Sequence, residues 1–549
     1  MAVDRLWGGG DNRRVMMFTL HRYIFRELLR VFLLSALALT VMVSLGSIIR
    51  PVQEYGVGPG QVMHFMVYFL PITLTFVLPM AALFASALVY GRFAADNELD
   101  ACRASGISLM SLVYPGLVLA VMVAIANLVL SFYVMPAFVQ RAEESLKADA
   151  KQIFFRNIQR RGYYELPPEK KYLVYADYAD PAEGVLSGVV VAEREGMRIG
   201  RTTAVERAKV NFISHSKYNE VQIIMENAMH LDAEGGRWVT VGFWAVAPRF
   251  GSLLADNIKF KNIREMKEIQ AAPLKFFPIA EAARKAYAQF AAELLAKEIG
   301  GATGAEGGAR EYELWKPGTL LRLAAGECAA SEDATVELSR DVTVREYERR
   351  TGELLRTWRC RKATLGLEGN EFDPMVTMTL RQPEREVAGG KKDLPQRHIF
   401  HGLMLPESVG RHIVEDIERI YRAEDVEAAL GGEPSARLAS LQSELRRQVD
   451  KAIAGIEAEI HFRLVFGLGC VTLIMISIGL GIIKRGGHLL SAFGASCVPA
   501  TGLLVCLLMG KNMAKHPGVE VTAGTMIMWA GLAGLTVLTV ALYRRLLRN

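Results

Sequence analysis

The chain has 549 residues, of which 51% are hydrophobic and 22% are charged, and its formal net charge is +6. A soluble protein rarely combines these fractions, so we expect apolar and charged residues to be segregated along the chain. They are, because Asp, Glu, Lys and Arg are absent from residues 31–49, 55–91, 104–140, 464–483, 489–510 and 521–543. Each run can cross a hydrocarbon layer of ~30 Å as a helix. This pattern excludes a soluble enzyme, a disordered chain and a nucleic-acid-binding domain, and it indicates a polytopic membrane protein.

Basic residues near these runs predict the orientation of the chain. Thirteen Lys and Arg lie before the first run or after the second, fourth and sixth, whereas the opposite short loops hold three, namely Arg50, Lys511 and Lys515. The positive-inside rule therefore predicts cytoplasmic termini, with residues 141–463 largely on the far side of the membrane. The first run exceeds the apolar core of a signal peptide, about 7–15 residues, and no A-x-A-like site follows it, so we expect a retained span.

The predicted fold is an α-helical membrane protein with three spans on each side of an inserted β domain resembling a jelly roll. Residues 1–140 should hold a cytoplasmic tail, an interfacial helix and the first three spans, with a short helix near residues 96–106. Residues 141–405 are rich in short β-branched and aromatic segments bounded by turn residues, which is typical of a sandwich or jelly roll. We expect a helical insertion at about 262–320, a charged helical connector at 406–460 and the last three spans at 461–549.

The sequence contains no constellation typical of an enzyme active site. It has no phosphate-binding G-x-x-x-x-G-K-[ST] loop, no H-E-x-x-H and no G-x-S-x-G. His398 and His401 lack a carboxylate pattern that would favour a metal site. We therefore expect no cofactor, no metal and no ATPase activity in this chain. Cys328 and Cys360 are the two cysteines of the external segment, and either one disulfide or two free thiols is compatible with the sequence.

The loop after the second apolar run predicts a short helix. Asp96 or Asn97 can cap its N-terminus, and Gly106 can end it. Glu98 and Asp100 lie in the first turn, where the helix dipole favours negative charge. The residues alone leave two interpretations open. The helix either joins two spans, or it is a rigid peg that docks in a groove of a cytoplasmic partner.

Several segments carry a family resemblance, and they occur in order along the chain. They are residues 21–25 (HRYIF), 43–54 (VSLGSIIRPVQE), 78–87 (LPMAALFASA), 97–108 (NELDACRASGIS) and 459–463 (EIHFR). With these segments the chain resembles the LptF/LptG family of permeases, the membrane subunits of the ABC-type lipopolysaccharide exporter. The 3 + 3 layout around a β-rich external domain agrees with this resemblance. The external segment is longer than is usual in the family, so the insertion inherits no role from it.

The resemblance implies a multi-pass protein of the bacterial inner membrane that extracts lipopolysaccharide or a related glycolipid. Its implied partners are a cytoplasmic ABC ATPase subunit, a paralogous permease subunit, a periplasmic jelly-roll bridge protein and membrane lipids, and no nucleic acid. The loop would be the coupling helix, with Glu98 as the coupling carboxylate beside Asp100, Arg103 and Gly106. Arg50 would bind a lipid A phosphate, whereas without the resemblance an interfacial anchor is favoured. The alternative function is a membrane-anchored envelope assembly scaffold without transport.

Overall fold

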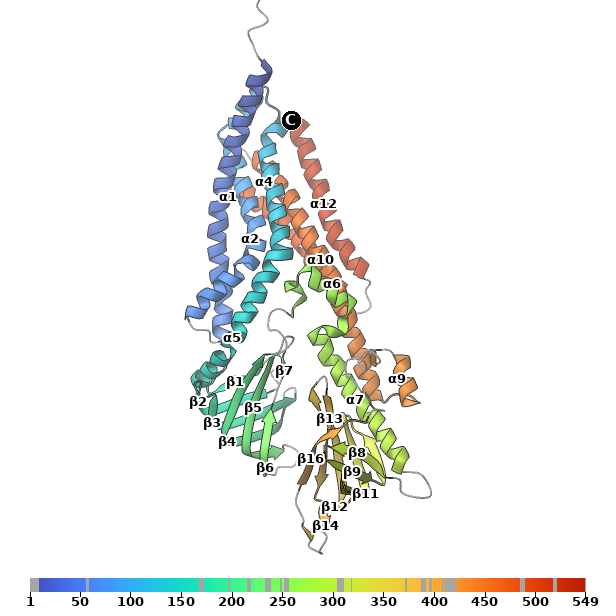
Figure 1. Cartoon of the computed structure of the whole chain (residues 1–549). Helices are drawn as coiled ribbons and strands as arrows, with labels where there is room; N and C mark the ends of the chain where they lie inside the picture. Colours follow the sequence, from blue (N-terminus) through green and yellow to red (C-terminus); the bar gives the residue numbers. More distant parts are fainter. Residues whose placement is uncertain are drawn as a thin grey trace, which may run out of the picture. The chain divides into compact units, whose positions relative to one another are not determined.

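The structure is a computed structural model of the chain (Figure 1). It describes residues 9–55, 59–166, 172–195, 198–214, 219–232, 238–246, 249–250, 256–303, 311–316, 318–370, 373–386, 392–393, 397–406, 409, 420–421, 423–483, 489–516 and 521–548. These residues form two compact units. One unit comprises Met1–Gln270 and Ile453–Asn549, and the other comprises Ala271–Ala452.

The first unit contains a bundle of long apolar helices. Its helices are α1 (Gly9–Tyr55), α2 (Pro59–Ala95), α3 (Glu98–Ala104), α4 (Leu109–Val129), the π-helix η1 (Leu130–Val134), α5 (Met135–Arg161), α11 (Leu489–Ala514), α12 (Val521–Arg548) and the larger part of α10 (Ala436–Ile483). Among the described residues, six helical segments are long and apolar enough to cross a membrane. They are Met17–Gly46, Val67–Ala95, Leu109–Glu144, Ala436–Ile483, Ser491–Ala514 and Val521–Arg548. The predicted polytopic fold with six spans is therefore confirmed.

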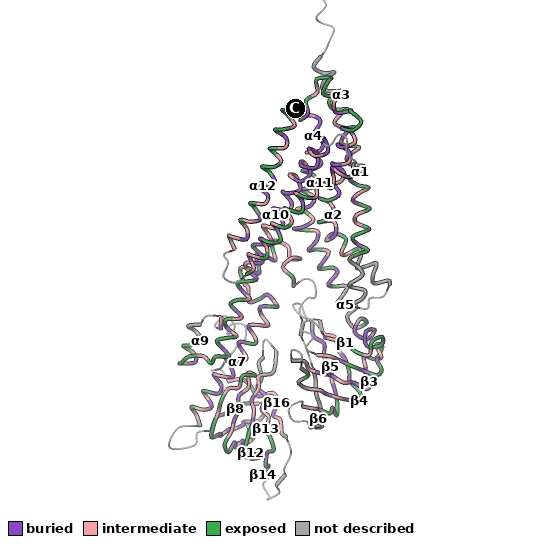
Figure 2. The backbone as a smooth tube through the Cα atoms, turned by 180° about the vertical axis from the view of Figure 1, so that it is seen from behind, coloured by how far each residue is buried: buried purple, intermediate pink, exposed green. Residues whose placement is uncertain are grey.

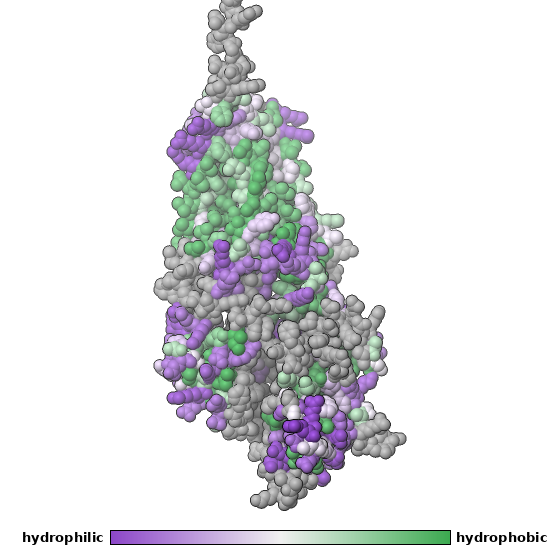
Figure 3. Space-filling model, viewed as in Figure 1, coloured by the Kyte–Doolittle hydropathy of each residue, from purple (hydrophilic) through white to green (hydrophobic). Residues whose placement is uncertain are grey.

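The bundle hides its polar groups and exposes apolar side chains. Figure 2 shows buried residues along its inner faces, and Figure 3 shows an apolar surface over the helices with hydrophilic residues at both ends. Buried polar side chains bind backbone carbonyls of neighbouring helices. The Tyr90 hydroxyl donates to Leu112 O at 2.9 Å, and the Ser477 hydroxyl donates to Leu83 O at 2.7 Å. Such bonds join helices where water is absent.

Helices α11 and α12 approach each other at two glycines. A Cβ atom on Gly510 would lie 2.4 Å from Gly524 O, and one on Gly524 would lie 2.5 Å from Gly510 O. Small residues allow helix backbones in a membrane to pack closely, because dispersion contacts rather than the hydrophobic effect hold the helices together. The two helices therefore form a closely packed pair.

A continuous rod of helix connects the bundle to the first sheet. The segments α4, η1 and α5 follow one another without a break. At the far end of α5, Phe154, Phe155 and Ile158 pack in one core with the sheet. The rod therefore places sheet A directly at one end of the bundle (Figure 1).

Sheet A is an antiparallel meander in which β1 to β6 pair in chain order and β7 pairs with β5. Its strands are β1 (Tyr163–Glu165), β2 (Tyr172–Asp180), β3 (Val185–Glu195), β4 (Arg198–Ser214), β5 (Asn219–Asp232), β6 (Trp238–Val246) and β7 (Arg249–Phe250). The 3-10 helix η2 (Ile258–Phe260) and α6 (Ile263–Ala271) follow. Residues 256–262, which we call the strap, lead into α6. The expectation of a β-rich domain inserted between the spans is confirmed.

The second unit contains sheet B and flanking helices. Its strands are β8 (Tyr312–Lys316), β9 (Thr319–Ala324), β10 (Glu327–Ala330), β11 (Thr335–Glu348), β12 (Leu354–Asn370), β13 (Asp373–Arg381), β14 (Glu384–Glu386), β15 (Lys392–Asp393) and β16 (Arg397–Met404). Strand β11 pairs with both β9 and β12, so the path β11-β9-β8-β16-β13-β12 closes on itself. The helices are η3 (Pro273–Lys275), α7 (Phe277–Thr303), α9 (Ala423–Leu430) and the start of α10.

The two external cysteines lie in different strands of sheet B. Cys328 pairs across β10–β11 with Leu338, whereas Cys360 pairs across β11–β12 with Val342. Strand β11 therefore separates them, and strands two positions apart are about 9–10 Å from one another, which is too far for a disulfide. Both thiols are free, and burial raises the pKa of each to about 11.

Because α11 and α12 touch at Gly510 and Gly524, we expect that a side chain at Gly510 destabilises the protein. Gly510→Ala should lower the free energy of unfolding by about 1–3 kcal/mol, because the new methyl group would collide with the backbone of α12. Thermal unfolding of the purified protein in detergent measures this effect. Gly502→Ala in the same helix is the matched control, because a Cβ atom there meets nothing within 4 Å. Equal stability of the two variants would contradict the contact.

Candidate functional site

The predicted short helix is present as α3 (Glu98–Ala104), at the end of the bundle opposite sheet A (Figure 2). Its C-terminus ends in a Schellman motif, in which Ile107 N donates to Cys102 O at 3.1 Å and Gly106 N donates to Arg103 O at 2.9 Å. Gly106 has a φ of 82°, a conformation that glycine adopts without a steric penalty. Gly106 therefore ends the helix as the sequence predicts.

The N-terminus of α3 differs in detail from the expected cap. Asn97 is the capping residue, but its side chain makes no capping hydrogen bond. Its backbone is left-handed, with a φ of 58°, whereas a side-chain cap requires an extended residue. The prediction of the capping residue was therefore right for Asn97, and the expected capping interaction was wrong.

Most of α3 is exposed, and one residue anchors it. Leu99 is 3% exposed and packs in the same apolar core as Ile24 and Leu28 of α1. Glu98, Arg103 and Gly106 are exposed, and Asp100 is half-buried. Burial, followed by the Glu98 carboxylate, raises the pKa of the Cys102 thiol, so this thiol is neutral at physiological pH. Leu99 therefore anchors α3 in the bundle, while the charged side chains of Glu98 and Arg103 face solvent.

Contacts with α1 hold the end of α2, which directly precedes α3. Arg92, in the last turn of α2, donates to the Glu27 carboxylate at 3.0 Å. The rings of Tyr23 and Phe93 stack with their centroids 5.9 Å apart. After α3, the Ser108 hydroxyl accepts from Ser111 N at 3.3 Å and caps α4, the start of the rod that leads to sheet A. α3 is therefore joined to α1, α2 and the rod.

The structure does not bring Arg50 together with the residues of α3. Arg50 lies near the opposite end of the bundle, in the last turns of α1, and its side chain is outside the described part of the chain. Its role as a lipid-binding residue remains a prediction.

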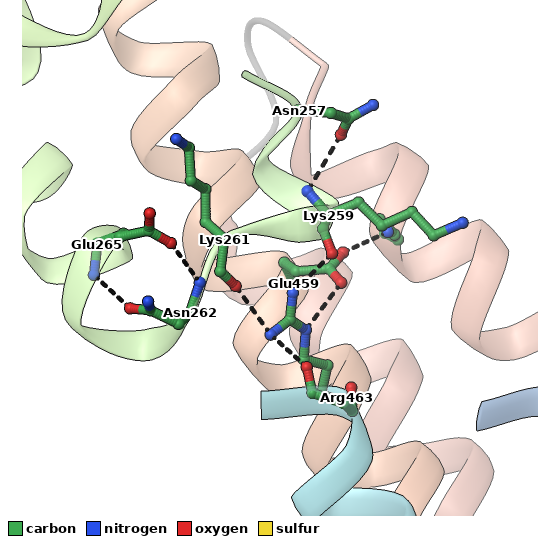
Figure 4. Close-up of polar contacts among 9 residues, drawn as sticks. Asn257, Lys259, Lys261, Asn262, Glu265, Glu459 and Arg463 are labelled. Atoms are coloured by element: carbon green, nitrogen blue, oxygen red, sulfur yellow. Dashed lines mark hydrogen bonds and ion pairs between the residues drawn. The ribbon is translucent and has the colours of Figure 1, made fainter. Parts of the chain in front are cut away.

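A buried ionic cluster occupies the end of the bundle next to sheet A (Figure 4). Its centre is Arg463 of α10, whose side chain is 1% exposed. The guanidinium donates to Glu459 Oε1 at 3.1 Å and to three backbone carbonyls, those of Ser131, Lys259 and Lys261, at 2.9, 2.7 and 3.1 Å. We call Arg463, Glu459, Lys511 and these carbonyls the Arg463 cluster.

Glu459 divides its carboxylate between two cations. One oxygen accepts from Arg463, and the other pairs with the Lys511 ammonium of α11. The Lys511 ammonium also lies 4.7 Å from the centroid of the Phe462 ring, a cation–π contact. A buried carboxylate is tolerated only when it is paired and hydrogen-bonded, and both conditions hold here.

The carbonyls bound by Arg463 come from two segments that are distant in sequence. Ser131 lies in the π-helix of the rod, and Lys259 and Lys261 lie in the strap. Asn262 and Glu265 form a capping box at the start of α6, with both reciprocal bonds at 2.8 Å. Burial, and then the nearby Lys511 charge, lowers the pKa of the Lys259 ammonium. The cluster therefore joins the strap, the rod, α10 and α11.

Sequence reasoning noticed residues 459–463 as part of a family resemblance but assigned them no role. Glu459 and Arg463 are four residues apart, a spacing typical of an ordinary surface pair on a helix. The sequence did hold one signal for this site. Glu459 and Arg463 directly precede the charge-free run 464–483, where a pair of charged side chains can be buried rather than exposed to solvent.

The comparisons with known proteins agree with the arrangement of the first half of the chain. Residues 22–247 match the family model described as "Lipopolysaccharide export system permease LptF/LptG". The match covers α1 to α5 and sheet A through β6, including α3, and it stops before the strap and residues 459–463. A comparison with curated proteins gives no match.

The burial of Arg463 predicts a large loss of stability when its side chain is removed. Arg463→Ala should lower the free energy of unfolding by about 3–5 kcal/mol, because Glu459 and three carbonyls would lose their shared donor. Thermal unfolding in detergent measures the loss. Arg264→Ala is the control, since this arginine also pairs with a glutamate four residues away but is 88% exposed. A loss no larger than that of the control would contradict the assigned role.

Proposed function

The chain belongs to the LptF/LptG family of lipopolysaccharide export system permeases through residues 22–247, and from this premise we propose that it is the membrane subunit of an exporter driven by a separate ATPase. The family makes it a membrane component of a transporter with no catalytic centre of its own. The fold with six spans is consistent with a multi-pass protein of the inner membrane. The ATPase, a paralogous permease subunit and a periplasmic bridge protein are proposed partners.

The observation that carries this proposal is the construction of α3. The helix is exposed, short and defined at both ends, and Leu99 fixes it in the core of the bundle. A partner that binds α3 therefore acts on a rigid element rather than on a loose loop. We assign Glu98 as the coupling carboxylate, with Asp100, Arg103 and Gly106 as neighbouring coupling residues.

The rod gives a route from α3 to sheet A. α3 is followed by the Ser108 cap, then by α4, η1 and α5, which ends in the core of sheet A. Sheet A has edge strands, and an edge strand can pair with a strand of another protein. We propose that lipid leaves the bundle and passes along sheet A to the bridge protein.

The first test concerns coupling at α3. Glu98→Lys should reduce lipid extraction per ATP hydrolysed by about tenfold or more, because it reverses a charge at the proposed interface. Extraction from proteoliposomes that hold the chain and its ATPase measures the ratio. Asp96→Lys is the control, because it makes the same change in the exposed turn before α3. Unchanged extraction in Glu98→Lys would refute the coupling role. Loss of the ATPase subunit from the purified wild type would favour an envelope scaffold.

The second test concerns Arg50. A guanidinium can make bidentate contacts with a phosphate, so Arg50 is proposed to bind a lipid phosphate at the end of the first span. Arg50→Glu should reduce photocrosslinking of lipid to α1 several-fold, and Arg50→Lys, which keeps the charge, should reduce it less. Equal crosslinking in the wild type and in Arg50→Glu would leave Arg50 as an interfacial anchor.

A further inference from the structure

One turn of α10 contacts four other parts of the first unit, namely α11, α12, the strap and the rod. Glu459 pairs with Lys511 of α11. Trp529 of α12 donates from its indole nitrogen to His461 Nδ1 at 3.2 Å. Arg463 holds the strap and the rod through their carbonyls. Residues 459–463 are therefore the point where these parts meet.

The connection made by Arg463 is a fixed one. Four hydrogen bonds engage its guanidinium, and its side chain has 1% exposure. Separation of the strap from α10 would remove two of the four acceptors of this buried guanidinium, and a buried charge is tolerated only with partners. Breaking the connection of the strap and the rod to α10 is therefore costly.

The connection made by Lys511 differs, because it can break without leaving a buried charge unpaired. Its side chain is 16% exposed, against 1% for Arg463, and it lies in the last turn of α11. Glu459 would keep its bond from Arg463.

Lys511 also belongs to a closely packed pair of helices. The adjacent residue is Gly510, whose contact with Gly524 holds α11 against α12. The Trp529 side chain on α12 is 39% exposed, so its bond to His461 lies at the surface. The two polar connections from the α11–α12 pair to residues 459–463 are therefore more exposed than the connection made by Arg463, and Lys511 also contacts the Phe462 ring.

We propose that the Lys511–Glu459 ion pair is a releasable latch, through which the ends of α11 and α12 next to sheet A separate from residues 459–463 while Arg463 keeps the strap and sheet A attached to α10. Further along the bundle, α10, α11 and α12 share an apolar core that includes Leu473, Leu503 and Leu532, and these parts stay together. This inference rests on the proposed function for its driving force, because the bound ATPase supplies the movement. It identifies Lys511 as a positioning residue for transport. The latch controls which helices move together, and neither Lys511 nor Glu459 needs to touch the lipid.

Two distances measured by pulsed electron paramagnetic resonance test the latch. The first distance joins spin labels at Glu457 of α10 and Met526 of α12, and it measures the opening of the latch. The second distance joins labels at Glu457 and at Lys267 of α6, and it measures the attachment of the strap. All three residues are exposed. In the full chain assembled with its ATPase, an ATP analogue should change the first distance by several ångströms and leave the second unchanged. If both distances changed together, or if the first stayed constant, the latch would be refuted.

The same labels separate the latch from the proposed function when no nucleotide is present. Lys511→Met should shift the distance distribution between α10 and α12 toward the released state, whereas Lys511→Arg should resemble the wild type. Thermal unfolding should be nearly unchanged in Lys511→Met, in contrast to Arg463→Met. A wild-type distribution in Lys511→Met would overturn the latch even if the ATPase binds. A shifted distribution in a chain that binds no ATPase would support the latch and reject the proposed function.

Discussion

The arrangement of the first unit depends on the burial of one guanidinium. A π-helical turn in a membrane helix displaces backbone carbonyls from the regular helical ladder, and these groups need another donor where water is absent. Arg463 supplies that donor to Ser131 and binds the strap with the same planar group. Glu459 balances its charge. Without this interaction the rod would carry an unsatisfied turn, and the strap before α6 would lose its hydrogen bonds to α10.

The rod gives this local interaction a wider consequence. It begins at the cap of α4, directly after α3, and it ends among the aromatic residues that hold sheet A. The Arg463 cluster contacts it at η1, between these two ends. A force applied at α3 and the position of sheet A are therefore both linked to α10. Under the proposed function, this linkage is the mechanical route from the bound ATPase to sheet A.

Much of this fold could be predicted from the sequence. The charge-free runs identify the spans, because a charge inside hydrocarbon is costly. The limits of α3 follow from Gly106 and from the acidic first turn. The Arg463 cluster could not be predicted, because its acceptors are backbone carbonyls, which any residue type supplies, and they lie more than 200 residues from Arg463. The close approach at Gly510 and Gly524 likewise depends on how two helices pack, and glycine is common in membrane helices.

The central claim is that α3 is the docking element for a separate ATPase, and crosslinking in native membranes tests it most directly. A photoreactive amino acid placed at Arg103 should give a covalent product with an ATPase subunit, because this side chain is exposed on α3. The same amino acid at His516, in the loop after α11 at the other end of the bundle, should not give this product. No ATPase product at Arg103, or equal products at both positions, would contradict the account.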